Sequence, residues 1–483
     1  MKIFLFILFL VGFTSTGFGQ GSHSSIHKKD LKKIIRILTA DSLGGRGTGT
    51  EGQKAAERFI CQNFKKLGLE TYSQKSYLEE FEVIKKYWGE VYIETGNTKL
   101  TNFKEIVFQG RDIKNEEVEK EVVFGGRGTD EELSQIDVAD RFVLIFVDNL
   151  RKGVLFSSKL AKRNAFGVIL ANPENDKQFE SIRRTLKDFY LRERFSLANE
   201  KASFRKPAEW DTVEYINQIS IPNDQIENIS GLSTQQLEKL IDQNRIEDAP
   251  TTKVRAKFER KEEKIETANV VGVLKGKTDK TIVISAHYDH LGKIGDQFFP
   301  GADDNASGTA GLIELAEKFS TVKNLNYNLM FLATSAEEAG LLGSKFHVNK
   351  KSFNPESILC NINLDMISRR DEKHYSGRYL YCIGSDQSAP LDALIKEADD
   401  LYTKCEFDFS LNDSTEPLGI FKRSDQYSFY EKGIPAIFFH SGTHADYHKI
   451  TDTANKISFR NLEHRVTLIS KVIELIQSEG LEN

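Results

Sequence analysis

Short apolar runs alternate with amphipathic segments through the C-terminal half of the chain. The runs TIVISA, NYNLMFLATSA, SILCNINL and IPAIFFH are rich in apolar residues, which is typical of strands buried on both faces of a sheet. Between them, GLIELAEKF repeats apolar residues at helix spacing, at Leu312, Leu315, Ala316 and Phe319. This alternation predicts an α/β domain whose mixed, mainly parallel sheet is sandwiched between helices.

The N-terminal part of the chain divides into a helical and a β-rich segment. The pattern is helical at residues 26–69, where the loop SLGGRGTGTEG joins two predicted helices. Short strands and turns, such as EVVFGG and DRFVLIFVDN, follow at residues 83–254. We therefore expect one domain built from residues 21–82 and 255–483, interrupted by an inserted β-rich domain at residues 83–254.

Residues 1–20 have the pattern of a secretory signal peptide. A Lys follows the initiator Met, an apolar run extends from Ile3 to Phe13, and small residues come next. Because that run is shorter than the ~20 residues of a membrane span, we expect no membrane anchor. The pattern predicts a periplasmic or secreted protein. Its four cysteines lack the spacing of a disulfide scaffold, and Cys360 and Cys382, which lie in apolar runs, are expected as buried thiols.

The composition is that of an ordinary globular protein. The 483 residues are 39% hydrophobic and 28% charged with a net charge of -5, which excludes a disordered or membrane-embedded chain. The sequence has no large basic patch, so we do not expect a nucleic-acid partner. The oligomeric state is left open.

Residues of the types that bind metal ions follow the four predicted strands. They are His287, the pair Glu337 and Glu338, Asp365 and, after a short loop, His448. Open α/β sheets bind ligands at the carboxyl ends of their strands. Histidines and carboxylates at one sheet edge therefore predict a divalent metal centre.

Three acidic residues near this edge have an alternative interpretation. Asp303, in GADDNASG, precedes a predicted helix and could cap its first turn. Glu337 and Glu338 could be favoured by the dipole at a helix start. The position of Asp303 between two strand-end clusters favours a metal ligand, and adjacent glutamates point apart. One glutamate can then bind metal while the other takes a proton from metal-bound water.

Five other histidines have ordinary structural explanations. His347 and His374 are expected at the surface or in a satisfied core, as His290 can be, whereas His440 and His444 could form a pocket wall before His448.

Five segments, in order along the chain, resemble one known family. SAHYDHLG, GADDNASGTAGLIELA, TSAEEAGLLGS, NINLDMI and DYHKITDTANKI are similar to the motifs of two-zinc exopeptidases of the bacterial leucyl aminopeptidase and glutamate carboxypeptidase type. The match extends from about residue 267 to the C-terminus and includes SLGGRGTGTEGQKAAERFI. It implies a zinc-exopeptidase fold and two Zn²⁺ per chain. Within the insertion, DRFVLIFVDN and SKLAKRNAFGVILANP resemble a protease-associated domain.

The resemblance also implies which residues bind the two zinc ions. One ion would be bound by His287, Asp303 and Asp365, and the other by Asp303, Glu338 and His448. Asp303 would then bridge the ions, and the peptide bond between Asp303 and Asp304 would be cis.

Three further residues receive catalytic roles from the resemblance. Glu337 would be the general base that deprotonates the bridging water and later protonates the leaving amine. Asp289 would orient His287. Tyr447 would donate a hydrogen bond to the tetrahedral oxyanion.

These observations predict an exported zinc aminopeptidase that acts on peptides with a free terminus. A carboxypeptidase or dipeptidase of the same family and a glutaminyl cyclase-like transferase are alternatives. A non-catalytic peptide-binding protein is a further alternative, although structural zinc sites are usually rich in thiolates and no Cys lies in these segments.

Overall fold

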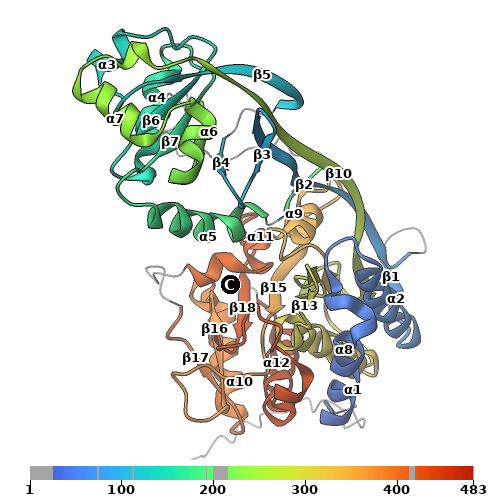
Figure 1. Cartoon of the computed structure of the whole chain (residues 1–483). Coiled ribbons are helices and arrows are strands. Elements are labelled where there is room, and N and C mark those ends of the chain that lie inside the picture. The colour runs from blue at the N-terminus through green and yellow to red at the C-terminus, as the bar shows by residue number, and fades with distance from the viewer. Residues whose placement is uncertain are drawn as a thin grey trace, which may run out of the picture. The chain divides into compact units, whose positions relative to one another are not determined.

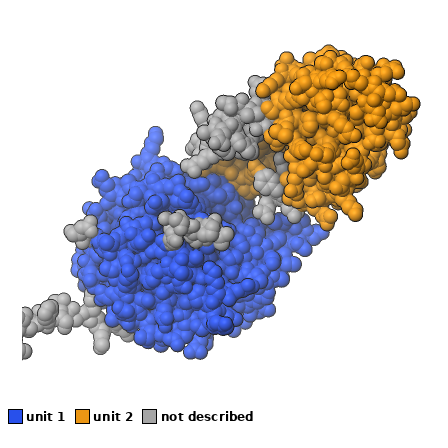
Figure 2. Space-filling model, turned by 90° about the vertical axis from the view of Figure 1, so that its left-hand side faces the viewer, with its two compact units in different colours: residues 1–81, 266–483 blue, residues 82–265 orange. Residues whose placement is uncertain are grey.

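The protein is described here by a computed structural model of the whole chain. The structure describes residues 25–72, 76–110, 114–191, 193–198, 216–412 and 419–481. The predicted signal peptide lies outside these residues. The chain divides into two compact units, unit 1 at residues 1–81 and 266–483 and unit 2 at residues 82–265, shown in blue and orange in Figure 2.

Unit 1 is built around a mixed, mainly parallel sheet (Figure 1). Its strands, in spatial order, are β17 (Glu406–Asp408), β16 (Tyr379–Ile383), β18 (Ala436–His440), β15 (Ile358–Leu364), β11 (Thr281–His287), β14 (Asn328–Thr334) and β10 (Thr252–Leu274). The central strands β18, β15, β11 and β14 are parallel to one another, whereas β10 and β16 pair antiparallel with their inner neighbours. Three two-residue strands complete unit 1: β1 (Glu70–Thr71), β12 (Lys293–Ile294) and β13 (Gln297–Phe298).

Helices cover both faces of this sheet because successive strand residues point to opposite sides. On β11, Ile282 and Ile284 pack in the larger apolar core with α1 (Lys28–Leu38), α2 (Glu51–Lys66), α8 (Gly308–Ser320), α10 (Ala389–Leu401) and α12 (Phe459–Glu479). Val283 packs on the other face with α9 (Leu342–Asn349) and α11 (Gln426–Tyr430). The predicted sheet between helices is confirmed.

Unit 2 is also an α/β structure. Its strands are β2 (Leu78–Thr95), β3 (Thr98–Thr101), β4 (Val107–Gln109), β5 (Lys114–Phe124), β6 (Phe142–Phe146), β7 (Gly167–Ala171), β8 (Arg194–Leu197) and β9 (Asn217–Ser220). Its helices are α3 (Asp130–Ser134), α4 (Gly153–Ala161), α5 (Lys177–Leu191), α6 (Ile226–Ser230) and α7 (Thr234–Asp242). The run β5, β6, β7 and β9 is parallel, with apolar cores on both faces.

The two units are joined by long strands. β2 begins in unit 1 and continues into unit 2, and β10 makes the return crossing without a break. The first part of β10 pairs with β5 and its last five residues pair with β14. The structural division at residue 265 therefore falls inside a continuous strand, whereas the sequence pattern placed it at residue 254.

Two further predictions concern membranes and cysteines. Within the described residues, none of the helices combines the length and apolar character required to cross a bilayer. All four cysteines are free thiols, and Cys360 and Cys382 are fully buried, as predicted.

Candidate metal centre

Chemically active side chains meet at the carboxyl ends of the parallel strands of unit 1. β14, β11, β15 and β18 are neighbours that run in the same direction, so they end at one edge of the sheet. His287 is the last residue of β11, Asp365 follows β15, and Glu337 follows β14 by a short turn. The turn at Ala302–Ser307, directly before α8, also reaches this edge and carries Asp304.

One group consists of His287, Asp304 and Asp365. His287 Nε2 lies 3.3 Å from Asp304 Oδ1 and 3.3 Å from Asp365 Oδ1, and all three residues are buried. Ser424 Oγ donates a hydrogen bond to Asp365 Oδ2 at 2.7 Å and so fixes that carboxylate. One ligand atom from each member lies within 4.8 Å of the others, close enough for a single metal ion.

A second group lies on the other side of Asp304. His448 Nε2 is 3.2 Å from Asp304 Oδ2 and 3.2 Å from Glu338 Oε2. His290 approaches from the buried side, with Nδ1 2.7 Å from Glu338 Oε1 and 3.8 Å from Asp304 Oδ2. The two carboxylate oxygens of Asp304 thus face different histidines, His287 and His448, as a carboxylate shared by two ions must do.

The shared carboxylate belongs to Asp304, and the sequence-based choice of Asp303 is wrong by one residue. Asp303 Oδ1 instead accepts the backbone N–H of Ser368 at 2.8 Å, and Oδ2 lies 3.2 Å from His444 Nε2. The cis peptide bond is likewise Asp304–Asn305 and not Asp303–Asp304. Neighbouring acids point in different directions, so the path of the backbone decides which one faces the histidines.

Gly301 makes this backbone path possible. It has a φ of +58°, which favours glycine, and a Cβ there would lie 2.2 Å from Asp304 O and 2.5 Å from the ring of His290. The carboxylate of Asp452 then accepts the backbone N–H groups of Asp303, at 3.0 Å, and Asp304, at 3.2 Å. The turn before α8 is therefore held so that Asp304 projects into both groups.

Glu337 and Asp289 lie beside the first group. Glu337 Oε2 is 3.8 Å from His287 Nε2, outside ordinary hydrogen-bonding distance. Asp289 Oδ1 accepts the backbone N–H of Glu337 at 3.1 Å. His287 Nδ1 is 3.1 Å from the backbone carbonyl of Asp289 and 3.8 Å from its carboxylate. Asp289 therefore contacts His287 through its backbone and Glu337 through its side chain.

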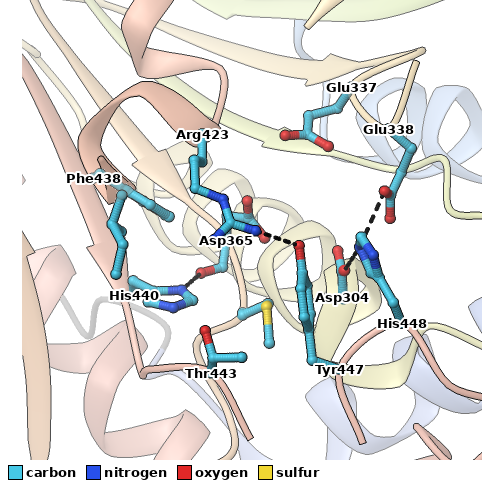
Figure 3. Close-up of a pocket in the computed structure, with 12 residues that line it drawn as sticks. Asp304, Glu337, Glu338, Asp365, Arg423, Phe438, His440, Thr443, Tyr447 and His448 are labelled. Carbon is cyan, nitrogen blue, oxygen red and sulfur yellow. Dashed lines mark hydrogen bonds and ion pairs between the residues drawn. The ribbon is translucent and has the colours of Figure 1, made fainter. Parts of the chain in front are cut away.

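A pocket opens over both groups (Figure 3). It is lined by Asp304, Glu337, Glu338, Asp365, Met366, Ile420, Arg423, Phe438, His440, Thr443, Tyr447 and His448. The ring of Tyr447 stacks on that of His448, with centroids 3.8 Å apart, and Arg423 Nη2 donates to the Tyr447 hydroxyl at 3.2 Å. Figure 3 shows Glu337 and Glu338 on one side of the pocket and Phe438 and His440 on the other.

Residues 269–473 match the sequence model of Peptidase family M28. This M28 segment makes up less than half of the chain, and over it the chain is similar to that family. Its M28 segment contains every member of both groups, together with Glu337 and Tyr447.

A named relative is similar to part of the sequence, and two solved structures are similar in fold. Aminopeptidase YwaD of Bacillus subtilis (strain 168) is 36% identical over 111 residues, which are 22% of this chain and 23% of that relative. The alignment thus spans less than a quarter of the relative's length. An aminopeptidase from Aneurinibacillus sp. strain AM-1 has a TM-score of 0.52 at 22% identity over 93% of both chains. BSAP, a zinc aminopeptidase from Bacillus subtilis, has a TM-score of 0.52 at 20% identity over 93% of this chain and 94% of its own. These two structures have the same fold.

The two groups and the pocket over them form a strongly anionic site, whose electrostatics favour cations. Burial, with Asp365 and Glu338 nearby, raises the pKa of Glu337 well above its usual range. Burial would also raise the pKa of Asp304, but the surrounding histidines hold it well below its ordinary value. For His448, burial would lower the pKa, but its contacts with Asp304 and Glu338 raise it to about 10. The imidazole of His448 therefore holds a proton at neutral pH, and a divalent ion could replace it.

Unpaired buried atoms provide a test of whether the residues fit a metal ion. His287 Nε2 and Asp365 Oδ1 are buried and make no hydrogen bond within the described part of the chain. Buried polar atoms rarely lack a partner, and these two belong to the same group. Imidazole and carboxylate donors at such spacing suit a zinc ion. This group of residues thus fits a bound metal ion.

Three further histidines lie near the two groups, and the sequence did not indicate the role of each of them. His290 lies beside Glu338. The sequence motifs assigned the metal ligands to other residues and left His290 with an ordinary structural explanation. His444 does not enter the pocket and contacts Asp303, whereas His440 lines the pocket, as its position had suggested.

The ordinary explanations for two other histidines fit their surroundings in unit 1. His347 is a buried core residue that contacts Glu79. His374 stacks on Tyr379 between the carboxylates of Asp371 and Asp408.

Proposed function

We propose that this protein is a zinc-dependent aminopeptidase that removes N-terminal residues from peptides. The observation that supports this most strongly is the carboxylate of Asp304, which faces His287 and Asp365 on one side and His448 and Glu338 on the other. Such a donor set would bind two zinc ions. The proposal is also supported by similarity to Aminopeptidase YwaD and to the fold of a zinc aminopeptidase.

The ligands of the second proposed ion are Asp304, Glu338 and His448. His448 approaches the same oxygens, Asp304 Oδ2 and Glu338 Oε2, that would face the ion. His290 Nδ1 lies 2.7 Å from the other oxygen of Glu338, but neither atom has a hydrogen-bond partner within the described residues, so His290 is an alternative ligand of this ion.

The bound zinc ions would polarise the carbonyl of the scissile bond and lower the pKa of the attacking water. Glu337 stands beside the first group and is the residue we assign to take the proton of that water and deliver it to the leaving amine. Tyr447, at the pocket rim, would donate a hydrogen bond to the oxyanion.

The acidic character of the pocket favours recognition of a substrate ammonium group. Four carboxylates line it, those of Asp304, Glu337, Glu338 and Asp365. A carboxypeptidase is the second candidate because Arg423 also lines the pocket and could bind a substrate carboxylate. The two functions differ in which end of the peptide must be free.

One short peptide, prepared in three forms, separates these functions. The forms have both termini free, the N-terminus acetylated, or the C-terminus amidated, and each is tested after metal removal and after zinc readdition. We expect zinc-dependent cleavage of the free and amidated forms with release of the first residue. Cleavage of the acetylated form, or loss of cleavage on amidation, would contradict an aminopeptidase.

We also propose that the chain is exported. This rests on the pattern of residues 1–20. Expression in a bacterial host, followed by N-terminal sequencing of the periplasmic fraction, should give a mature chain that starts near residue 20. Retention of the uncleaved chain in the cytoplasm would contradict export.

A further inference from the structure

The two glutamates of the site lie on a strained connection that we call the glutamate loop, residues 335–343. It runs from the end of β14 into the first turn of α9 and contains Glu337 and Glu338. Ala336 and Leu341 have φ values of +56° and +62°, a region that L-residues with a side chain rarely occupy. Such backbone persists only where its surroundings hold it. The question is therefore which residues hold this loop.

Asn269, on β10, joins the two ends of the glutamate loop. Its Oδ1 accepts the backbone N–H of Ser335 at 3.0 Å, and its Nδ2 donates to the carbonyl of Gly343 at 2.9 Å. The side chain is completely buried. A Cβ at Gly343 would lie 2.2 Å from Ser335 O and 2.4 Å from Asn269 Oδ1, so the ends of the loop meet too closely for any residue but glycine. The amide therefore closes the loop at its base.

Glu79 fixes the orientation of that amide. Asn269 Nδ2 also donates to Glu79 Oε2 at 2.7 Å, so the nitrogen faces two acceptors while the oxygen faces an N–H donor. Glu79 is 4% exposed and is held by Lys350 Nζ at 2.8 Å and His347 Nδ1 at 3.0 Å. Because His347 lies on α9 and Lys350 follows it, Glu79 ties β2 to the helix that leaves the loop.

A second set of hydrogen bonds holds the start of the loop. Ser335 Oγ accepts from Gln53 Nε2 at 2.6 Å and lies 2.5 Å from Thr267 Oγ1. Thr267 and Asn269 are two residues apart on β10 and therefore point to the same face. Ser335 is thus held at its backbone by Asn269 and at its side chain by Gln53 and Thr267.

We propose that Asn269, oriented by Glu79, is a positioning residue for Glu337. The inference rests on the proposed function only in naming Glu337 as the proton acceptor. The hydrogen bonds of Asn269 join it to Glu79 and to the two ends of the glutamate loop, so it acts through the backbone of that loop. Small displacements of a reacting group cost activity, so loss of the amide lowers kcat more than it changes substrate binding.

The test compares Asn269→Ala with Asn328→Ala. Asn328 is a matched control, since it is a buried asparagine at the opposite end of β14 whose Oδ1 accepts a backbone N–H, from Gly276 at 2.9 Å. With zinc saturating and metal content measured, Asn269→Ala should lower kcat roughly 30-fold and leave KM within about twofold, because a misplaced group can cost up to about 100-fold. Asn328→Ala should keep kcat within about twofold. Equal losses of kcat in the two variants would overturn the inference.

A pair of substitutions provides a second test of the inference if the Asn269→Ala variant does not fold. Asn269→Asp places a carboxylate against Glu79 and removes the donor to Gly343, so kcat should fall. Adding Glu79→Gln supplies an amide opposite the new carboxylate and should recover kcat by at least about fivefold, since directly contacting sites couple. Additive losses in the double variant would contradict the pairing of Asn269 with Glu79.

A readout that does not require activity separates this inference from the proposed function. Amide hydrogen exchange of residues 335–343 is measured in the metal-free protein. Asn269→Ala should speed exchange there by at least about tenfold while leaving β18 unchanged, and unchanged exchange in the loop would overturn the inference. If the wild-type protein cleaves no peptide, the proposed function fails and this measurement still tests the positioning.

Discussion

The two units have related architectures but different chemistry at their strand ends. Both contain a run of parallel strands with helices and an apolar core on each face. In unit 1 the strands lead to buried His287, Asp365 and Glu337. In unit 2, β6 leads to Asp148, which is exposed and paired with Lys152. Among the described residues of unit 2, Glu132 is the only buried charged side chain. Both units have parallel strands that end at one edge of a sheet. The side chains at that edge decide whether it can bind metal ions and catalyse a reaction.

The largest expected effect comes from removing the carboxylate shared by the two groups. Asp304→Asn should lower zinc affinity by at least about 100-fold and abolish detectable cleavage, because loss of even an outer contact to a metal ligand costs 10–100-fold. Zinc content after dialysis provides the measurement. Asp303→Asn is the control and should retain both ions. Zinc loss in the Asp303 variant alone would restore the sequence-based assignment.

The second prediction compares strand-end carboxylates in the two units. Glu337→Gln should lower kcat about 1000-fold with zinc content unchanged, because general base catalysis contributes roughly 10²–10⁴-fold. Asp148→Asn, at the corresponding end of β6 in unit 2, should leave kcat unchanged. Steady-state kinetics on the free peptide measures both. A near-normal kcat in the Glu337→Gln variant would contradict the role of Glu337 as the general base.

The third prediction concerns the pocket rim. Tyr447→Phe removes the hydroxyl that would face the oxyanion and should lower kcat about 100-fold, in line with the loss of one oxyanion donor. KM should change by less than about twofold, because the interaction is proposed for the transition state. A raised KM with unchanged kcat would show that Tyr447 binds substrate instead.

The smallest expected effect compares a buried carboxylate of unit 1 with an exposed one of unit 2. Burial alone would raise the pKa of Glu79, but His347, Lys350 and Asn269 lower it from 4.5 to about 2. A lowered pKa in the folded state stabilises the protein above pH 4.5, and this contribution is lost as the pH falls towards 2. Glu79→Gln should therefore cost about 3 kcal/mol of unfolding free energy at pH 7 and progressively less below pH 4.5.

Urea unfolding followed by circular dichroism at several pH values measures this effect. Glu90→Gln is the control, since Glu90 is exposed and pairs with Lys257 at 2.9 Å on the surface of unit 2. Exposed ion pairs contribute little to stability, so this variant should behave like the wild type. A pH-independent loss in Glu79→Gln would contradict the lowered pKa of Glu79.

Much of the site in unit 1 could be predicted because its residues follow recognisable strands. The runs before His287 and Asp365 are continuous and apolar, so strand ends could be placed closely from the sequence. Which of two adjacent acids faces the histidines depends on the backbone turn at Gly301, and neither hydrophobic periodicity nor residue type records that turn. The error of one residue between Asp303 and Asp304 has this origin.

Other features left no signal in the sequence. The division at residue 265 lies within β10, whose strand pattern continues through the crossing without a turn residue. Asn269 stands at the start of the apolar run VVGVL, and its contacts with Ser335 and Gly343 depend on long-range pairing. Residues that act through tertiary contacts of this kind cannot be found from local pattern.

The most direct test of the central claim is anomalous diffraction from crystals of the zinc-loaded protein. The account predicts two zinc peaks roughly 3.5–4 Å apart, as in other two-metal sites, with one carboxylate oxygen of Asp304 directed to each. His287 and Asp365 should contact one peak, and Glu338 and His448 the other. A single peak, or two peaks shared by Asp303, would contradict the assignment of Asp304 as the bridging ligand.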